Sequence, residues 1–279
     1  MKSTSLNINF QENAWWFIIA NDQILLQPQG DFIPYGNLDD LPLSAELVTH
    51  KIKLGVYQSS PCYLVILPDQ HDLGFGAYED LRFLLGRVDD LLFDMAGRAF
   101  QIKLFYQTHQ YCGQCGEKMH AIHWEVAMKC YHCQHRCYPR ISPCIIVGIR
   151  KENKILLALH QRHQKNNHPI YTVLAGFVEA GETLEACIHR EVYEEAHIKV
   201  KNIEYVGSQP WPFPHSLMMG YIADYESGEI RIDHKELCSA DWYDMDNLPH
   251  VPDHGTLARQ LINKLVTQSS QPTAPLSME

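Results

Sequence analysis

The sequence predicts an α+β fold in which a small cysteine-rich module separates two larger domains. Short apolar runs closed by turn residues recur in both larger parts, as is typical of strands. Two CxxC pairs mark the middle of the chain, and one amphipathic helical pattern is flanked by strand-like runs. We place an N-terminal domain at 1–106, the cysteine-rich module at 107–140, a C-terminal domain at 141–266 and a disordered polar tail at 267–279. The sequence shows no internal repeat.

Composition excludes several classes of protein. The chain has 279 residues, of which 46% are hydrophobic, so a sizeable core is expected. A formal net charge of −10 argues against broad adhesion to nucleic acid or to an anionic membrane. The start of the chain resembles no export signal, and no apolar run has the length of a membrane span. We therefore expect a cytoplasmic protein with no membrane partner, whose nine cysteines form no disulfide framework.

The N-terminal part reads as strands followed by helix. The runs AWWFIIAN and CYLVILPD predict two strands. Residues 78–109 carry leucine and phenylalanine at helical spacing, with breaks expected at Gly86 and Gly97. No catalytic motif occurs here, so a scaffold or interface role is expected.

The cysteine pairs CGQC and CYHC lie fourteen residues apart. Each pair can turn both thiolates toward one ion, and two pairs complete a closed tetrahedral zinc site, which is structural. A redox role is less favoured because two matched pairs share one small module. The predicted ligands are Cys112, Cys115, Cys130 and Cys133, with Cys137, His132 and His135 as alternatives for the fourth position. We expect the module to brace the fold rather than to bind nucleic acid.

The C-terminal part predicts a sheet with two helices. SPCIIVGIRKENKILLALH predicts a hairpin, QRHQKNNHP a polar loop and IYTVLAGF a strand. IEYVGSQPWPFPHSLMMGYIADY predicts two strands around a proline-rich loop, DWYDMDNLP a closing loop and GTLARQLINKLV a terminal helix. A further helix is predicted from Thr183, its N-cap, to Ala196, with Leu184, Ile188 and Val192 as its buried stripe.

That further helix carries crowded carboxylates beside its apolar stripe. At about 100° per residue, Glu191, Glu194 and Glu195 gather at one margin. Unpaired, these groups would repel and raise one another's pKa, and a hard divalent cation such as Mg²⁺ or Mn²⁺ would resolve the conflict. The alternative is a solvated face whose charge is offset by Arg190 and His189.

The residues around this helix resemble the Nudix box. Gly176, Glu182, Arg190-Glu191-Val192, Glu194-Glu195 and Ile198 meet eight of its nine fixed positions, and His197 stands in place of a glycine. That glycine serves the left-handed turn that ends the helix, where histidine is tolerated at some cost. The resemblance implies an α/β/α Nudix sandwich that hydrolyses a nucleoside diphosphate linked to another moiety. It implies that Glu191, Glu195 and Glu194 bind the catalytic cation, with Glu194 also a candidate base, that Arg190 orients them, and that Glu182 supports the loop or a further metal.

The second clue is the segment from Ser208 to Met218, in which prolines alternate with Trp211 and Phe213. A stiffened backbone holds aromatic rings in fixed poses, which suits stacking on a flat heterocycle; the alternative is a surface loop packed on the core. Together with the cysteine module, this array resembles the NADH pyrophosphatase subfamily of Nudix hydrolases.

This second resemblance implies a substrate and a set of contacts. The activity would be metal-dependent hydrolysis of the diphosphate of NAD(H), giving nicotinamide mononucleotide and AMP, and removal of NAD caps from RNA. Family members are homodimers. The matching substrate positions are Glu125, Tyr138, Ala175, Phe177, Gln209, Pro210, Trp211, Pro212, Phe213, Pro214, His215, Ser216 and Ala258, while Glu236 and the Ala175 carbonyl match further metal ligands. Two alternatives stay open: RNA decapping with little turnover of free dinucleotide, and a non-enzymatic zinc-ribbon module that binds nucleic acid.

Overall fold

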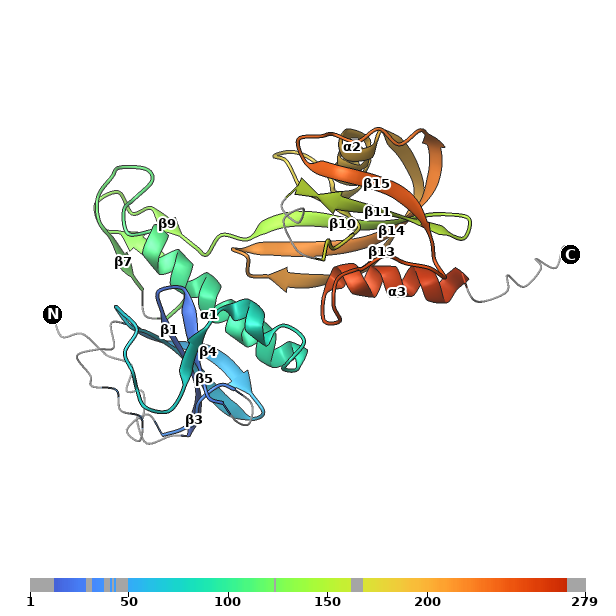
Figure 1. The fold of residues 1–279 in the computed structure, drawn as a ribbon. Coiled ribbons are helices and arrows are strands. Elements are labelled where there is room, and N and C mark those ends of the chain that lie inside the picture. Colours follow the sequence, from blue (N-terminus) through green and yellow to red (C-terminus); the bar gives the residue numbers. More distant parts are fainter. Residues whose placement is uncertain are drawn as a thin grey trace, which may run out of the picture. The chain divides into compact units, whose positions relative to one another are not determined.

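The structure, a computed structural model, describes residues 13–28, 32–37, 41, 43, 50–122, 124–161 and 168–269 (Figure 1). Its contacts divide the chain into two compact units. The N-terminal unit extends to Arg140 and includes Pro212–His215, and the C-terminal unit comprises Ile141–Trp211 and the chain from Ser216 onward. Most of the predicted loop QRHQKNNHP and residues 270–279 of the predicted tail lie outside the described residues.

The N-terminal unit is built on a six-stranded sheet. Its central strand β1 (Ala14–Ala20) pairs in parallel with β5 (Ser60–Ile66) and antiparallel with β2 (Gln23–Leu26) and β3 (Tyr35–Gly36). The edges are β4 (His50–Tyr57), beside β5, and β6 (Ala77–Glu79), beside β2. Every residue of β1 is buried because both faces of the sheet are covered, which explains why its sequence is apolar throughout. Both strands predicted in this part are confirmed.

One face of this sheet packs against helix α1 (Asp90–Thr108). The Asp89 carboxylate caps the helix by accepting a hydrogen bond from the Leu92 amide at 3.1 Å. A short 3₁₀ helix, Leu81–Leu84, precedes it, and the predicted break at Gly86 is confirmed by a left-handed φ of 72°. The break predicted at Gly97 is wrong. Gly97 lies within α1, and a Cβ there would meet Pro212 Cγ at 2.8 Å, so glycine permits close packing rather than a bend.

The cysteine-rich module forms a three-stranded sheet of β7 (Met119–Ala121), β8 (Met128–Cys130) and β9 (Arg136–Cys137). Its side chains alternate between two faces. Met119, Met128 and Cys130 are buried and pack with Phe105 of α1, which ties the module to the rest of the N-terminal unit.

The C-terminal unit is a sheet between two helices (Figure 1). The strands are β10 (Ser142–Lys151), β11 (Lys154–His160), β12 (Leu174–Phe177), β13 (Ile198–Trp211), β14 (Ser216–Gly228) and β15 (Leu237–Asp244). Alternate residues of β10 feed two cores: Ile145 and Val147 face α2 (Leu184–Ala196), while Ile146 faces α3 (Leu257–Ser269). This arrangement confirms the expected α/β/α sandwich, the hairpin of β10 with β11 and the helix capped by Thr183.

Four predicted loops or boundaries in this unit are wrong. DWYD belongs to β15, where it pairs with β11, and not to a closing loop. The proline-rich loop is shorter than predicted, because Ser208–Trp211 continue β13 and pair with Ser216–Met219 of β14. Residues 267–269 extend α3 and are not tail, and β12 begins only at Leu174. In each case the local sequence did not specify where the element begins or ends. Pairing or packing with a distant segment sets that bound.

The two sheets share one topology, so the expectation of no internal repeat is wrong at the level of structure. Strand orders β4-β5-β1-β2-β6 and β13-β14-β10-β11-β15 correspond position by position. In each, the central strand has one parallel and two antiparallel partners, and the third strand pairs with it off the main path. No helix within the described residues is long and apolar enough to cross a membrane.

Candidate active site

The carboxylate site is built at the end of β12, in the loop before α2 and along the second half of α2. The Thr183 hydroxyl accepts a hydrogen bond from the Ala186 amide at 3.2 Å, which fixes where the helix begins. Just before it, the Glu182 carboxylate accepts from the Glu179 amide at 3.0 Å and closes the loop. The helix ends at His197 in the left-handed conformation, with φ 61°, where the family pattern has glycine. The local frame therefore forms despite that substitution.

Arg190 gathers three carboxylates around one guanidinium. Its Nε and Nη2 each donate to Glu182 at 2.8 Å, which makes a bidentate pair. Its Nη1 donates to Glu191 at 2.8 Å and to Glu194 at 3.1 Å. Nη2 also donates to the Phe177 carbonyl at 2.9 Å, which ties the helix to the end of β12. Arg190 thus offsets part of the negative charge, as the solvated-face reading expected, and it also fixes the glutamates in place.

Gly176 lies directly against the Glu191 carboxylate. A Cβ built at Gly176 would come within 1.8 Å of Glu191 Cδ, far inside contact distance. Gly176 is in β12, where it pairs with Ile145, so its backbone cannot move aside without breaking the sheet. The glycine is needed for this close approach, and Glu191 is contacted both by the strand and by Arg190.

The pKa is lowered for Glu182 and raised for Glu191, although both carboxylates contact Arg190. Hydrogen bonds from Arg190 and from the Glu179 amide lower the pKa of Glu182 to about 2, so this carboxylate stays ionised. Burial raises the pKa of Glu191, Arg190 opposes the rise, and the charges of Glu194 and Glu236 add to it. Glu191 therefore lies among negative groups that a single arginine does not fully balance.

The other predicted cation ligands are also carboxylates, but among the described residues only the four cysteines bring three or more metal-ligating atoms into one cluster. Glu195 is 2% exposed and lies beside the apolar stripe, as predicted, whereas the Glu194 side chain is 58% exposed. Glu236 comes just before β15, where its carbonyl accepts from the Gln161 amide at 2.9 Å. Carboxylate oxygens are the donors that Mg²⁺ and Mn²⁺ prefer, and such an ion would offset the charges of Glu194 and Glu236, which add to the rise that burial causes in the Glu191 pKa.

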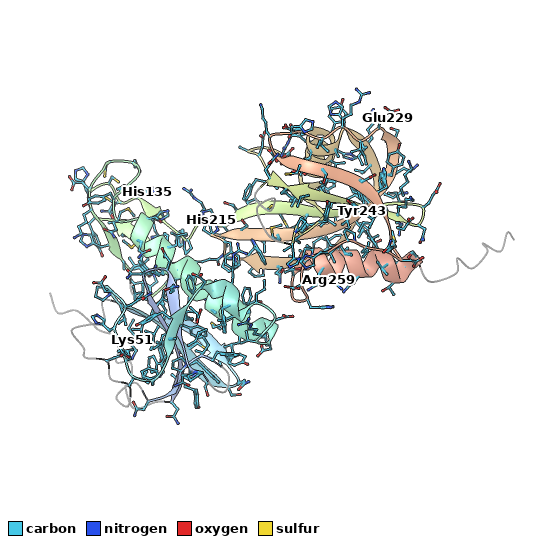
Figure 2. The ribbon with its side chains drawn as sticks, viewed as in Figure 1. Lys51, His135, His215, Glu229, Tyr243 and Arg259 are labelled. Carbon is cyan, nitrogen blue, oxygen red and sulfur yellow. The ribbon has the colours of Figure 1, made fainter. Side chains whose placement is uncertain are left out.

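The four predicted zinc ligands come together in the cysteine-rich module. The ligand atoms of Cys112, Cys115, Cys130 and Cys133 all lie within 4.8 Å of one another. Two of the sulfur–sulfur distances are 3.5 Å, which is too long for a disulfide and close to the edge of a zinc–thiolate tetrahedron. Cys137, His132 and His135 are not members of this group; His135 is labelled in Figure 2. Among the described residues, the four cysteines therefore supply the zinc site.

The predicted substrate contacts divide between the two units. The C-terminal unit holds Ala175, Phe177, Gln209, Pro210, Trp211, Ser216 and Ala258 together with all the glutamates of the helix. The N-terminal unit holds Glu125, Tyr138, Pro212, Phe213, Pro214 and His215 (labelled in Figure 2). Within the C-terminal unit the Gln209 amide is already engaged, because it donates to the Gly255 carbonyl at 2.7 Å and accepts from the Leu257 amide at 2.8 Å. Gln209 therefore fixes the start of α3 to β13.

Phe213 is held by the N-terminal unit. The Arg82 guanidinium carbon lies 3.9 Å from the centre of the Phe213 ring, which is a cation–π contact. Phe213 packs against the core beneath α1, and with Arg82, Asp80 and Asp22 it lines a cavity of about 510 Å³. One face of the ring is thus covered by arginine, and the ring is fixed before any ligand binds.

Glu125 and Tyr138 lie together in the cysteine-rich module. Arg136 Nη1 is 3.1 Å from Glu125 Oε1 and 3.5 Å from the Tyr138 hydroxyl, and that hydroxyl donates to Glu125 at 3.5 Å. Half of the Tyr138 surface is exposed, so its ring is available to a ligand. The two residues predicted from the family pattern are therefore neighbours, joined by an arginine that the pattern did not include.

Sequence reasoning missed three contributors to the site. The Phe177 carbonyl and the Cys187 sulfur, 3.5 Å from Arg190 Nη2, both contact the central arginine. Cys187 could have been found from its position, since it lies three residues before Arg190 on the same helix. Arg82 carries no such signal, because its contact with Phe213 joins segments far apart in the chain.

Comparison with known proteins places the chain in a family. The NUDIX domain matches residues 139–265, the NADH pyrophosphatase zinc ribbon domain 107–138, and the NADH pyrophosphatase-like rudimentary NUDIX domain 13–103. The protein of Escherichia coli O81 called NAD-capped RNA hydrolase NudC is 48% identical over 91% of this chain and 94% of its own length. The protein of that name from Photorhabdus laumondii is 47% identical over the same shares. A solved NUDIX hydrolase of Nitrosomonas europaea is 19% identical, with a TM-score of 0.45 over 56% of this chain and 91% of its own.

These matches agree with the observed features: a glutamate helix gathered by one arginine, a four-cysteine ribbon and a second sheet of the same topology. The chain belongs to the NUDIX hydrolases of the NADH pyrophosphatase type.

Proposed function

We propose that this protein hydrolyses the diphosphate bond of NAD(H), giving nicotinamide mononucleotide and AMP, and removes NAD caps from the 5′ ends of RNA. The observation that carries the proposal is the Arg190 cluster, in which one guanidinium fixes Glu182, Glu191 and Glu194 beside the buried Glu195. The names of its relatives, NAD-capped RNA hydrolases, supply the substrate class.

A divalent cation, Mg²⁺ or Mn²⁺, would be held by Glu191, Glu194, Glu195 and Glu236, with the Ala175 carbonyl as a further ligand. When bound, such an ion neutralises diphosphate charge and makes a water molecule a better nucleophile. Arg190 keeps the glutamates oriented through charge-assisted hydrogen bonds, so little reorganisation is needed when substrate arrives. Glu194 is the exposed member of the set, and we assign to it the role of accepting the proton of the attacking water.

We assign dinucleotide contacts within each unit, taken by itself. Phe213, held by Arg82 and half-buried, offers an aromatic ring for stacking on a base. Tyr138 and Glu125 offer a ring and a carboxylate held by Arg136. The proposed contacts also include Ala175, Phe177, Gln209, Pro210, Trp211, Pro212, Pro214, His215, Ser216 and Ala258. Gln209 would act by fixing the start of α3, because both ends of its amide are engaged.

Several broader features belong to the same proposal. We assign the N-terminal domain to 1–106, the zinc ribbon to 107–140 and the hydrolase domain to 141–269, where α3 ends. None of the nine cysteines forms a disulfide, and four of them are the proposed zinc ligands, which supports a cytoplasmic location. A homodimer is the expected assembly, and light scattering of the purified protein tests it.

The deciding experiment uses the purified full-length protein with NADH, NAD and an NAD-capped RNA, each with and without Mg²⁺ or Mn²⁺. Cation-dependent release of nicotinamide mononucleotide and AMP from the free dinucleotides is the expected result. From capped RNA, the expected products are the mononucleotide and a 5′-monophosphorylated RNA. The absence of both reactions in the presence of either cation would overturn the proposal.

RNA decapping as the main role is the second candidate, and the names of the relatives favour it. The ratio of kcat/KM for capped RNA to that for free NADH, measured in one buffer, separates the two roles.

A further inference from the structure

The outer face of the zinc ribbon carries a row of nitrogen-bearing side chains across its three strands. In the register of the sheet His120 of β7 lies opposite Lys129 of β8, and Lys129 lies opposite Arg136 of β9. Directly opposite residues point to the same face of a sheet, so the three side chains form one line, here called the ribbon row. The other face holds Met119 and Met128, which pack on Phe105.

An exposed ring lies next to this row. The Tyr131 side chain is 59% exposed, its ring centre is 5.4 Å from the His120 ring, and Lys129 Nζ lies 5.4 Å from the same ring centre. An exposed aromatic face beside a cation is the combination by which proteins hold unpaired bases and their phosphates. A double helix would not offer its bases to this ring, because they are stacked on one another.

The charge of the ribbon differs in sign from that of the chain. Residues 107–138 contain three lysines or arginines and two glutamates, whereas the whole chain has ten more acidic than basic groups. One of those two glutamates, Glu125, pairs with Arg136 at 3.1 Å, which leaves Lys129 as the cation of the row without a carboxylate partner among the described residues. A weakly basic patch on an acidic protein favours a polyanion at that patch alone.

The position of the row links it to two predicted substrate contacts of the same ribbon. Its Arg136 end contacts Glu125 and Tyr138, both expected to contact the dinucleotide. From there the row leads over Lys129 to His120 and Tyr131. Three strands span about 10 Å, which is room for about three stacked nucleotides.

We propose that the ribbon row and Tyr131 bind the first nucleotides of single-stranded RNA that follow an NAD cap. This inference rests on the proposed function and deepens it, because it assigns recognition of the RNA body to a surface that free NAD(H) does not need. Tyr131 stacks on an unpaired base, and Lys129 contacts a phosphate. The zinc ion acts by keeping the ribbon folded.

The test compares free NADH with NAD-capped oligonucleotides of one, two, three and ten nucleotides, using the full-length zinc-loaded protein and Mg²⁺. For the wild type, kcat/KM is expected to rise with length over the first few nucleotides and then level off. Tyr131→Ala is expected to lower kcat/KM for the longer RNAs at least about fivefold, the smaller end of what base stacking on a ring contributes. Lys129→Ala is expected to weaken RNA binding and to reduce the slope of log K against log salt by about 0.7.

Controls separate this effect from damage to the fold. Tyr131→Phe keeps the ring and is expected to behave as the wild type. Lys151→Ala removes a lysine that lies 4.4 Å from a tyrosine ring in the C-terminal unit, and is expected to leave RNA turnover unchanged. Zinc content measured by mass spectrometry should stay at one ion per chain in every variant.

The outcomes distinguish the inference from the proposed function. If Tyr131→Ala and Lys129→Ala leave the dependence on RNA length intact, or lower NADH turnover as much as RNA turnover, the inference is wrong while the proposed function stands. If the wild type hydrolyses neither substrate, the proposed function fails and takes the inference with it.

Discussion

The two sheets of this protein share a topology but differ in what connects their third and fourth strands. In the C-terminal unit, residues 178–197 lie between β12 and β13 and contain α2 with its glutamates. In the N-terminal unit the corresponding interval, between β3 and β4, is residues 37–49, whose sequence NLDDLPLSAELVT has no arginine and no paired glutamates. The comparison teaches that the sheet is a scaffold, and that the arginine and the paired glutamates come with the connection between its third and fourth strands.

The largest effect is expected from removing a carboxylate of α2, the helix that carries the glutamates of the C-terminal unit. Glu191→Gln keeps shape but removes the charge that would bind the cation, so kcat should fall about 10³-fold, within the range for losing a catalytic carboxylate. Glu185→Gln, an exposed position in the first turn of the same helix, is the matched control and should retain activity. Near-normal turnover of Glu191→Gln at saturating Mg²⁺ would show that the cation site is elsewhere.

Adding a methyl group at Gly176 should lower the catalytic rate almost as much as the loss of the Glu191 charge. Gly176→Ala places a Cβ where the Glu191 carboxylate lies, so the carboxylate must move by about 1 Å or more, which costs about 10²-fold in rate. Gly207→Ala in β13 meets nothing within 4 Å and serves as the control. Steady-state kinetics on NADH measure both. Equal activities of the two variants would contradict the close approach described for Gly176.

Loss of zinc should lower the melting temperature of the N-terminal unit and leave that of the C-terminal unit unchanged. Cys115→Ser removes a ligand, and because the ribbon shares a core with Phe105 of α1, the N-terminal unit should melt more than about 10 °C lower. The transition of the C-terminal unit, which has its own cores, should not move. Calorimetry with zinc analysis checks this, and Cys238→Ser is the control. A common shift of both transitions would mean that the units unfold together.

The smallest expected effect concerns pH and stability. The pKa of Glu182 is about 2 in the folded protein and near 4.5 in an unfolded chain, so its ionised form stabilises the fold above about pH 4.5. That contribution is lost as pH falls from 4.5 toward 2. Glu182→Gln should therefore be less stable than the wild type at neutral pH, and the difference should close on acidification. Denaturant unfolding at several pH values measures the difference in stability. The control is Glu204→Gln, which removes a surface ion pair with Lys264.

Much of the site follows from short-range patterns. The zinc ligands come as two local pairs, and the helix from Thr183 to Ala196 has a cap, a stripe and a stop that neighbouring residues determine. The burial of Glu195 followed from helical angle alone. These features were predictable because each depends on residues within a few positions of one another.

Other features depended on contacts between distant segments. Gly97 was predicted as a break because glycine weakens a helix, but its role is to admit Pro212 from more than a hundred residues away. The strand containing DWYD became visible only through its pairing with β11. The fixed pose of Phe213 depends in the same way on Arg82.

The sequence by itself determined which chemical groups this protein has and that a cation and a zinc ion suit them, because donor types and helical spacing are local properties. Only the tertiary structure decided that Arg190 binds three glutamates at once, that Gly176 adjoins Glu191 and that the same sheet occurs twice. Those facts depend on the register between strands and on packing across the fold. Both join residues far apart in the chain, and many residue combinations are compatible with the same backbone arrangement, so local patterns do not specify these contacts.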